Sequence, residues 1–248
     1  MKIIPHNKEL LLKHWLFKKG NIVFIHGFSS TYYKSIEFLF SLFKKGYNVY
    51  AFDLPNHGMN NDYDKQMSVE EYVNWIKEKI KKIGLKRFVL IGHSMGGGIA
   101  SFIANEFDKI SKLVLLDPFN FGYASSHRKL FVLALSVAKP FPAAVSPLLV
   151  KNPEVPSFDP RVLLLSMYKE SFLDEMNQNV KKNNKPTLII FGEKDDVINP
   201  VLSTNYFNEV CYDKKCVIKI MKNQKHSPHV YAVNETLNIV LSFIKHGK

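Results

Sequence analysis

The fold is decided by the stretch Phe88-Val-Leu-Ile-Gly-His-Ser-Met-Gly-Gly-Gly98. It opens with an apolar run that is typical of a strand buried on both faces. It then passes through the pattern G-x-S-x-G, from Gly92 to Gly96, into an apolar segment that suits a helix. A serine between a strand and a helix lies on a sharp turn that exposes its hydroxyl, and a Cβ at either glycine would collide where the two elements pass. The stretch therefore predicts Ser94 as a nucleophile rather than an incidental serine in a glycine-rich turn.

Strands and helices alternate on both sides of this stretch. Apolar runs predict two or three strands within residues 1–26, among them 10–17 and 21–25. Further strands are predicted at 47–52, 88–91, 112–116, 187–191 and 216–221. Helical spacing predicts helices at 35–45, 68–83, 201–210 and 228–245, and Ser68 and Glu71 form a capping box at the start of the second. Such alternation indicates an α/β fold with a mostly parallel central sheet and helices on both faces.

The segment 118–185 has a different pattern. It lacks a strand-like run, and its short helical pieces, such as 128–138 and 160–169, are separated by prolines. We therefore expect a core of 1–117 and 186–248, with 118–185 inserted as a helical cap. The cap should lie over the carboxyl ends of the strands, where open α/β sheets place their sites.

Composition limits the partners of the chain. Its 248 residues are 46% hydrophobic and 23% charged, which is ordinary for a packed globular protein. The net charge of +12 comes from 34 Lys+Arg against 22 Asp+Glu, but the lysines are scattered as pairs near element ends. Without a nucleic-acid-binding motif, this pattern predicts a solvated surface and no nucleic-acid partner. Peripheral contact with anionic lipid stays open, and the sequence says nothing of oligomeric state.

The cysteines and apolar segments indicate a cytoplasmic location. Cys211 and Cys216 are too few for a disulfide framework, so we expect free thiols in a reducing compartment. The amino-terminal residues contain no continuous apolar region of a signal peptide. The longest apolar segment, 130–138, falls far short of the roughly 20 residues that span a bilayer, so no stable membrane insertion is expected.

A serine nucleophile needs a general base, which we expect after the last strand. A serine hydroxyl is a weak nucleophile near neutral pH and requires a base within hydrogen-bond reach. The run Lys222-Asn-Gln-Lys-His226 leaves the last predicted strand at the same edge of the sheet as Ser94. His226 is therefore the predicted base. His229 is the rival, although it should begin the final helix as a surface histidine.

The base in turn needs an orienting carboxylate. The run Gly192-Glu-Lys-Asp195-Asp196 follows the preceding strand and gives the chain order serine, acid, histidine. We favour Asp195, and Asp196 and Asp117 remain alternatives.

The oxyanion of a tetrahedral intermediate needs hydrogen-bond donors. The backbone N–H of Met95, at the start of the nucleophile helix, is one candidate. The backbone N–H of Phe28 is the second, because the turn His26-Gly27 follows a neighbouring strand and could bring the chain close enough. The alternative is that His26-Gly27 is only a turn.

Together these motifs resemble the α/β-hydrolase fold family. The resemblance rests on His26-Gly27-Phe28, Asp53-Leu-Pro-Asn-His-Gly58, Gly92-His-Ser-Met-Gly-Gly97, Gly192-Glu-Lys-Asp195 and His226-Ser-Pro-His229. It implies Ser94 as nucleophile, Asp195 as acid and His226 as base, with Phe28 and Met95 in the oxyanion hole and no metal or cofactor. It also implies that the cap is inserted after the sixth strand. One departure is Asn56, where the family usually has glycine, and we expect a small local change of backbone there.

The resemblance also indicates a reaction. The elbow is similar to that of carboxylesterases and monoacylglycerol-type lipases, which implies a serine esterase that forms an acyl-enzyme on Ser94. Because the predicted cap is rich in Phe, Leu and Val, we expect a small-molecule ester substrate with a small or medium apolar acyl group. The alternatives are a carbon–carbon bond hydrolase, an enzyme like the menaquinone-pathway lyase, a thioesterase or acyltransferase, and a non-catalytic ligand-binding member of the fold.

Overall fold

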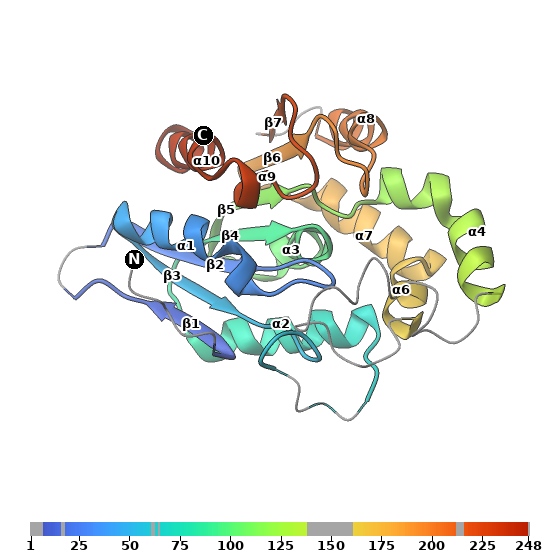
Figure 1. Ribbon diagram of the computed structural model, residues 1–248, viewed down its shortest axis with the longest axis horizontal. Helices are drawn as coiled ribbons and strands as arrows, with labels where there is room; N and C mark the ends of the chain where they lie inside the picture. The colour runs from blue at the N-terminus through green and yellow to red at the C-terminus, as the bar shows by residue number, and fades with distance from the viewer. Residues whose placement is uncertain are drawn as a thin grey trace.

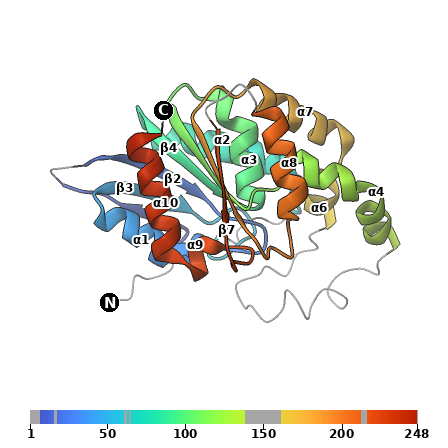
Figure 2. The same ribbon diagram turned by 90° about the horizontal axis from the view of Figure 1, so that it is seen from above.

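A seven-stranded sheet forms the centre of the protein, in the order β1-β3-β2-β4-β5-β6-β7 (Figures 1 and 2). The computed structural model describes residues 7–15, 18–60, 63, 65–137, 161–211 and 216–247. The strands are β1 (Glu9–Leu12), β2 (Gly20–Ile25), β3 (Tyr47–Phe52), β4 (Phe88–His93), β5 (Ile110–Leu116), β6 (Thr187–Gly192) and β7 (Cys216–Met221). β1 runs antiparallel to β3, and every other pairing is parallel. The predicted mostly parallel sheet is confirmed.

Helices cover both faces of this sheet, as predicted. One face packs against α1 (Ile36–Lys44) and α10 (Val233–His246), and the other against α2 (Val69–Ile83), α3 (Met95–Ile103), α7 (Glu170–Lys182) and α8 (Pro200–Val210) (Figure 1). The remaining described helices are η1 (Tyr32–Ser35), η2 (Ala104–Glu106), α4 (Phe121–Val137), α6 (Arg161–Met167) and α9 (Pro228–Tyr231). Helices α4 and α6 lie towards the carboxyl ends of the strands, at the right of Figure 1.

Local signals explain the elements that agree with the prediction. β3 is buried along its whole length, and it begins directly after Gly46, whose φ of 98° ends the preceding helix. Helix α2 begins at the capping box: the Ser68 hydroxyl accepts the Glu71 N–H at 3.4 Å, and the Glu71 carboxylate accepts the Ser68 N–H at 2.8 Å. The helix ends at Gly84, which has a left-handed φ of 68°.

The structure differs from the prediction at three elements. The first strand ends at Leu12, since His14 turns away to stack on Phe43 with ring centroids 4.2 Å apart, and positions 16–17 lie outside the described residues. Five described strands precede the inserted segment, not six, because the described residues before β2 contain one strand, β1. The final helix is interrupted at Ala232, which separates α9 from α10.

The expectation of free thiols is wrong. Cys211, at the end of α8, and Cys216, at the start of β7, form a disulfide with their Cα atoms 5.9 Å apart. That separation lies in the range that a disulfide requires. The count of cysteines could not reveal the pairing, because it depends on how the end of α8 lies relative to the start of β7.

Part of the segment between β5 and β6 packs directly against the helices on the sheet. Helix α7 lies against α3, where Phe172 stacks on Phe102 with centroids 5.2 Å apart. Residues 138–160 lie outside the described part, so the division into a core of 1–117 and 186–248 and a cap of 118–185 stays a prediction. No helix in the described ranges has the length and apolar character needed to cross a membrane.

Candidate active site

Ser94 occupies a strained turn between β4 and α3. Its φ of 52° and ψ of −120° are unusual for a residue with a side chain. A Cβ on Gly92 would collide with the backbone of Gly96, and a Cβ on Gly96 would collide with the carbonyls of Ile25 and His26. The two glycines therefore let α3 start close to β2 and β4, as the motif predicts. Among the described residues, the Ser94 hydroxyl makes no hydrogen bond.

The turn after β2 lies against this serine. A Cβ on Gly27 would lie 2.9 Å from the Cβ of Ser94 and 3.0 Å from Nδ1 of His93, so only glycine fits there. His26 holds the turn: its Nε2 accepts the Leu54 N–H at 2.9 Å, which leaves Nδ1 to donate to the Gly27 carbonyl at 2.8 Å. The sequence indicates only a turn at His26-Gly27 and does not reveal this role of His26.

Two backbone donors remain without a partner near Ser94. The N–H groups of Phe28 and Met95 donate to no group in the described part of the chain. Met95 is the first residue of α3, so its N–H is one of the donors that a helix leaves unpaired at its amino end. Phe28 follows Gly27, where an added Cβ would lie 2.9 Å from the Cβ of Ser94. Both donors therefore belong to the immediate surroundings of the Ser94 turn.

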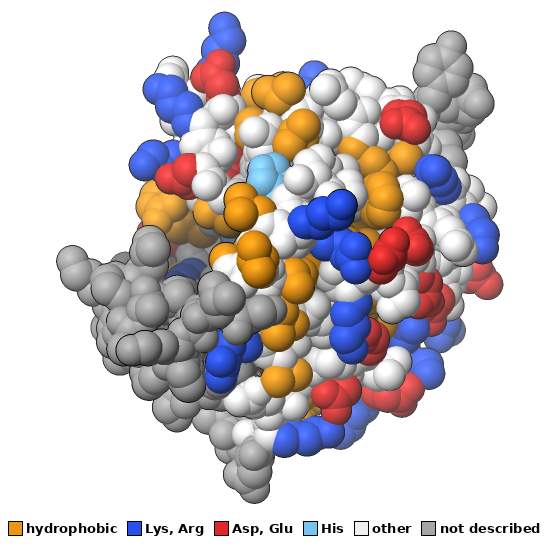
Figure 3. All heavy atoms as spheres, turned by 90° about the vertical axis from the view of Figure 1, so that its right-hand side faces the viewer, with side chains coloured by type: hydrophobic (Ala, Val, Ile, Leu, Met, Phe, Trp, Pro, Cys, Tyr) orange, Lys and Arg blue, Asp and Glu red, His pale blue; other side chains and the backbone are white. Residues whose placement is uncertain are grey.

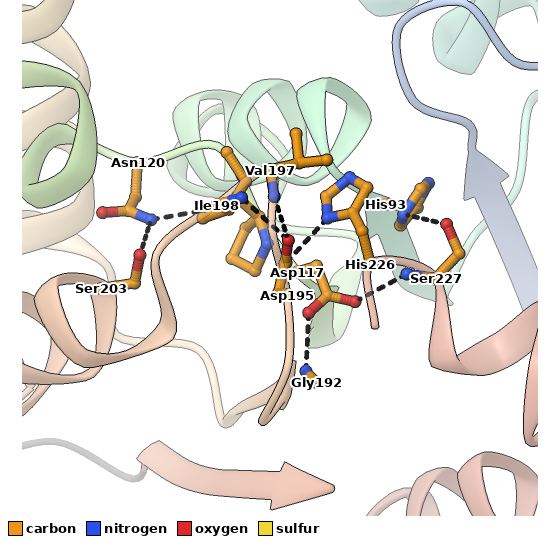
Figure 4. Close-up of polar contacts among 11 residues, drawn as sticks. His93, Asp117, Asn120, Gly192, Asp195, Val197, Ile198, Ser203, His226 and Ser227 are labelled. Atoms are coloured by element: carbon orange, nitrogen blue, oxygen red, sulfur yellow. Dashed lines mark hydrogen bonds and ion pairs between the residues drawn. The ribbon is translucent and has the colours of Figure 1, made fainter. Parts of the chain in front are cut away.

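His226 and Asp195 form the central polar contact (Figure 4). Nδ1 of His226 lies 2.8 Å from Oδ2 of Asp195, and the Asp195 side chain is 0% exposed against 15% for His226. The other carboxylate oxygen of Asp195 accepts the N–H groups of Val197 and Ile198 at 2.8 and 2.9 Å. The carboxylate is therefore held by the loop after β6, with one oxygen directed at the histidine from the loop after β7.

The rival residues have different surroundings. Asp196 is exposed and acts on His226 only through its charge. His229 is buried, not on the surface as expected, and its Nε2 lies 3.1 Å from the Ser35 hydroxyl. Its Nδ1 has no hydrogen-bond partner among the described residues. The structure thus brings His226 to Asp195 and keeps His229 on the far side, against η1.

Asp117 is a second buried carboxylate next to His226. Its Oδ1 accepts the Gly192 N–H at 2.8 Å and its Oδ2 accepts the Ser227 N–H at 3.2 Å (Figure 4). It therefore ties together the end of β6 and the loop that carries His226. Burial raises the pKa of Asp117 to about 7, helped by the charge of Asp195 and opposed by the charge of His226. From the sequence, Asp117 is only a less favoured candidate for the orienting carboxylate.

His93 packs behind the catalytic candidates. Its ring lies between those of His226 and His229, at centroid distances of 4.9 and 4.5 Å, and its Nε2 lies 3.1 Å from the Ser227 hydroxyl. Burial, followed by the charges of the neighbouring histidines, lowers the pKa of His93 well below its ordinary value. His93 is therefore neutral, and it fills space beside His226 without adding charge.

The pKa of His226 shows which influence dominates at this site. Burial alone would lower it, but the hydrogen bond and charge of Asp195, together with the charges of Asp117 and Asp196, outweigh burial and raise the pKa above its ordinary value. For His229, burial and then the charge of His226 lower the pKa to about 3. Of these two histidines, only His226 has a carboxylate that stabilises its protonated form.

Apolar side chains surround the Ser94 turn. The N–H of Phe119 donates to the Ser94 carbonyl at 3.0 Å, Phe119 meets Tyr168 edge-on at 5.4 Å, and Tyr168 stacks on Phe131 at 4.2 Å. Hydrophobic side chains gather on the face of the molecule shown in Figure 3. A hollow of about 560 Å³ lies next to His226, lined partly by Val197 and Tyr231. A separate hollow of about 630 Å³, beside Phe52 and Trp75, has neither Ser94 nor His226 in its lining.

One group of side chains is close enough to suggest a cation. Ligand atoms of His93, Asp117 and His226 lie within 4.8 Å of one another. However, the His93 Nε2 is in contact with the Ser227 hydroxyl, and both Asp117 oxygens accept backbone N–H groups. We therefore assign no cation to this group.

The loop after β3 supports the turn that precedes Phe28, because the Leu54 N–H donates to His26. Asp53 accepts the N–H groups of Tyr32 and Met59 at 3.1 and 2.9 Å. Asn56 has a φ of 58°, a left-handed conformation that asparagine tolerates better than most residues, and its side chain donates to the Lys65 carbonyl at 2.9 Å. The asparagine thus takes the place of the usual glycine without a break in the loop.

Comparison with known proteins identifies the family of this chain. The model of the family described as "Alpha/beta hydrolase family" matches residues 22–230. A Mycoplasma pneumoniae protein named "Putative esterase/lipase 2" is 30% identical, over 93% of this chain and 91% of its own. The human protein named "Monoacylglycerol lipase ABHD6" is 24% identical, over 91% of this chain and 75% of its own. The crystal structure of Paleococcus ferrophilus monoacylglycerol lipase has a TM-score of 0.75, with 21% identity, over 97% of this chain and 98% of that one. Since the family match covers most of the sequence, this chain belongs to the alpha/beta hydrolase family, as a hydrolase of the esterase/lipase type.

Proposed function

We propose that this protein is a serine hydrolase that cleaves carboxylic esters with small or medium apolar acyl groups. The observation that carries the proposal is the 2.8 Å contact between His226 and the buried Asp195, at the sheet edge where the β4–α3 turn exposes Ser94. An imidazole that donates through Nδ1 to a carboxylate keeps a lone pair on Nε2, so it can accept a proton from a hydroxyl.

In the first half of the reaction, the Ser94 oxygen attacks the ester carbonyl while His226 Nε2 takes the hydroxyl proton. The carbonyl oxygen becomes an oxyanion, which the N–H groups of Phe28 and Met95 stabilise. The intermediate then collapses: the bond from carbon to the alcohol oxygen breaks, and His226 returns its proton to that oxygen. Asp195 stays ionised and stabilises the protonated ring throughout. The products are an alcohol and an acyl group on Ser94.

In the second half, water replaces the alcohol. His226 takes a proton from the water as its oxygen attacks the acyl carbon, and the same two N–H groups stabilise the second oxyanion. The carbon–Ser94 bond breaks, and His226 gives the proton back to the serine oxygen. A carboxylic acid leaves, and the enzyme is ready for the next ester. The Ser94 hydroxyl makes no hydrogen bond to a described residue, and contacts between a nucleophile and its base often tighten only in the substrate complex.

The apolar acyl preference is supported by the aromatic cluster next to the nucleophile. Phe119 hydrogen-bonds to the Ser94 backbone and leads through Tyr168 to Phe131. Phe119 and Tyr168 are buried, and Phe131 is the partly exposed member of the cluster. An acyl chain that covered Phe131 would exchange water for aromatic surface, at about 25 cal/mol for each Å² of apolar area buried.

A fluorophosphonate probe tests the nucleophile. Wild type should be labelled and Ser94→Ala should not, while Ser227→Ala, a serine in the same site with a different role, should still react. Labelling of both wild type and Ser94→Ala, or of neither, would end the serine hydrolase proposal.

A panel of p-nitrophenyl esters from acetate to palmitate tests the substrate class. We expect the highest kcat/KM at short or medium chains and a fall towards palmitate. A flat zero across a panel on which the probe still labels Ser94 would favour the carbon–carbon hydrolase or acyltransferase alternatives over an esterase.

A further inference from the structure

Basic side chains are concentrated at the amino ends of the strands. Exposed lysines and arginines precede β2, β3, β4 and β5 or end the helices α1, α2 and α7 at that same end of the sheet. We call this set the basic edge: Lys18, Lys19, Lys44, Lys45, Lys81, Lys82, Lys86, Arg87, Lys109, Lys181 and Lys182.

Backbone and side-chain contacts place these residues side by side. The Lys19 N–H donates to the Gly46 carbonyl at 2.8 Å, directly after Lys45. Asn21 donates to the Arg87 carbonyl at 2.9 Å, which joins the start of β2 to the start of β4. The Phe88 N–H donates to the Lys109 carbonyl at 3.0 Å, which continues the edge to β5. The basic residues therefore belong to one surface, although they come from distant parts of the chain.

The helix dipole explains the presence of only some of these basic residues. Lysines at the carboxyl ends of α1, α2 and α7 complement the negative end of each helix dipole. That reason does not apply to Lys18, Lys19, Lys86, Arg87 and Lys109, which precede strands. Acidic neighbours offset only part of the charge. Glu78 is bound to Lys81 and Glu106 to Lys77, and the exposed Asp108 directly precedes Lys109. A positive field therefore remains at this end of the molecule.

An aromatic side chain stands out at the same end. Trp15, in the connection from β1 to β2, is 96% exposed. His14, next to it, is held on α1 by its stacking on Phe43 and by a 2.8 Å contact between its Nε2 and the Phe43 carbonyl. Trp15 is thus presented to solvent from an anchored position, flanked by the exposed Lys13 and Lys18.

We propose that the basic edge and Trp15 dock this protein on a bilayer that contains anionic phospholipid. Lysines attract the phosphate groups of such a bilayer, and an indole ring settles at the level of the headgroups. One exposed indole beside a broad positive surface suits a flat membrane better than a nucleic acid, which would call for a groove and several stacking rings. The amino ends of the strands face away from α4 and α6 (Figure 1), so the bound protein turns its candidate active site towards water.

Tryptophan fluorescence with vesicles tests the proposal. The chain has 2 tryptophans, so Trp75→Phe leaves Trp15 as the reporter. We expect phosphatidylglycerol vesicles to shift the Trp15 emission to shorter wavelength, and phosphatidylcholine vesicles to leave it unchanged. Trp15→Ala should weaken co-sedimentation with the anionic vesicles.

Matched charge reversals provide the control. The variant K18E/K19E/K86E/R87E should lose at least several hundred-fold in vesicle affinity, at roughly five-fold for each basic residue near an anionic surface. The variant K129E/K169E/K194E/K222E changes the net charge equally, at exposed lysines of the opposite end, and should lose far less. Circular dichroism checks that both variants fold. If the first variant does not fold, a salt titration of wild type replaces it: the proposal then requires that wild type is released from the anionic vesicles between about 0.05 and about 0.5 M NaCl.

Equal binding to both kinds of vesicle, or equal losses in the two fourfold variants, would overturn the proposal. Binding of single-stranded RNA through the same lysines, without vesicle binding, would also overturn it and assign the basic edge to nucleic acid. Ser94→Ala should bind vesicles like wild type, so this test stands apart from the proposed hydrolase activity.

Discussion

His226 and His229 are close in the sequence but have opposite chemical surroundings. Asp195 and the nearby carboxylates raise the pKa of His226 against the effect of its burial, whereas burial lowers the pKa of His229 to about 3. A general base must pass through a protonated state, and only His226 has a partner that stabilises that state. The difference of surroundings, not of residue type, separates the two roles.

Substitutions of His226 and Asp195 should lower kcat far more than substitutions of His229 and Asp196. His226→Ala should lower kcat by about 10⁴- to 10⁶-fold, and Asp195→Asn by about 10⁴-fold, since each removes a member of a unit that acts together. Steady-state hydrolysis of a short p-nitrophenyl ester measures both. The matched variants His229→Ala and Asp196→Asn should keep most of kcat in enzyme that remains folded. A dead His229→Ala with an active His226→Ala would reverse the assignment.

Asp117 should influence the pH dependence without being the acid of the triad. Its negative charge favours the protonated form of His226, so Asp117→Asn should lower the pKa of that histidine. A base with a lower pKa is free of its proton at lower pH, and the acid limb of kcat/KM should therefore move to lower pH. Profiles of the variant and wild type measure the shift; Asp196→Asn, which removes an exposed charge, should shift the limb less. A move to higher pH would contradict this role.

At the scale of secondary-structure elements, the β4–α3 turn depends on close backbone contact. The start of α3 passes so near to the turn after β2 that a Cβ on Gly96 would collide with two carbonyl groups. The same approach brings the turn that leads to Phe28 close to the start of α3, where Met95 lies. The shape of the turn and the placement of the two candidate oxyanion donors therefore have one origin.

Gly96→Ala tests this packing. The added methyl group meets backbone that cannot rotate away, so we expect a loss of about 1–3 kcal/mol or more in the free energy of unfolding, and a fall in kcat as the donors move. Urea denaturation and ester hydrolysis measure the two effects. Gly20→Ala is the control, because its Cβ would lie 3.7 Å from the nearest atom, on the Tyr47 ring, in ordinary contact. Similar behaviour of the two variants would argue against a tight turn.

Elements with local signals could be predicted, and those determined by distant contacts could not. The strand at 47–52 and the helix after Ser68 have their boundaries in the sequence itself, as a glycine, an apolar run and a capping box. The disulfide between Cys211 and Cys216 depends on how α8 meets β7, and the burial of His229 depends on Ser35, far back in the chain. The double role of Asp117 likewise needs two loops that only the folded sheet brings together.

At the scale of the whole molecule, charge is distributed unevenly. The basic edge lies at the amino ends of the strands, whereas Asp117 and Asp195 lie at their carboxyl ends beside His226. The sequence shows the excess of lysine but not the side of the molecule on which the lysines gather, because the lysine pairs are spread from Lys18 to Lys182 along the chain. Only the parallel sheet, which returns every crossover to the same end, gathers them.

Repulsion within the basic edge should make stability depend on salt. Screening of like charges favours the folded protein, so we expect the Tm to rise by a few degrees between about 0.02 and about 0.5 M NaCl. Calorimetry or fluorescence melting measures it. K18E/K19E/K86E/R87E should show a smaller rise, since the repelling charges are gone. A Tm that falls with salt would show that attractive ion pairs dominate instead.

The strand that leads to His226 is the outermost of the sheet. β7 pairs with β6 and ends the strand order, so it lies at the rim of the sheet, while Ser94 follows the central β4. Outer strands open more readily than inner ones, through fluctuations that leave the rest intact. Catalytic activity should therefore be lost at a temperature below the Tm, and it should return when the protein is cooled. Such a hydrolase would be inactivated reversibly by local opening of its outermost strand, below the temperature of global unfolding.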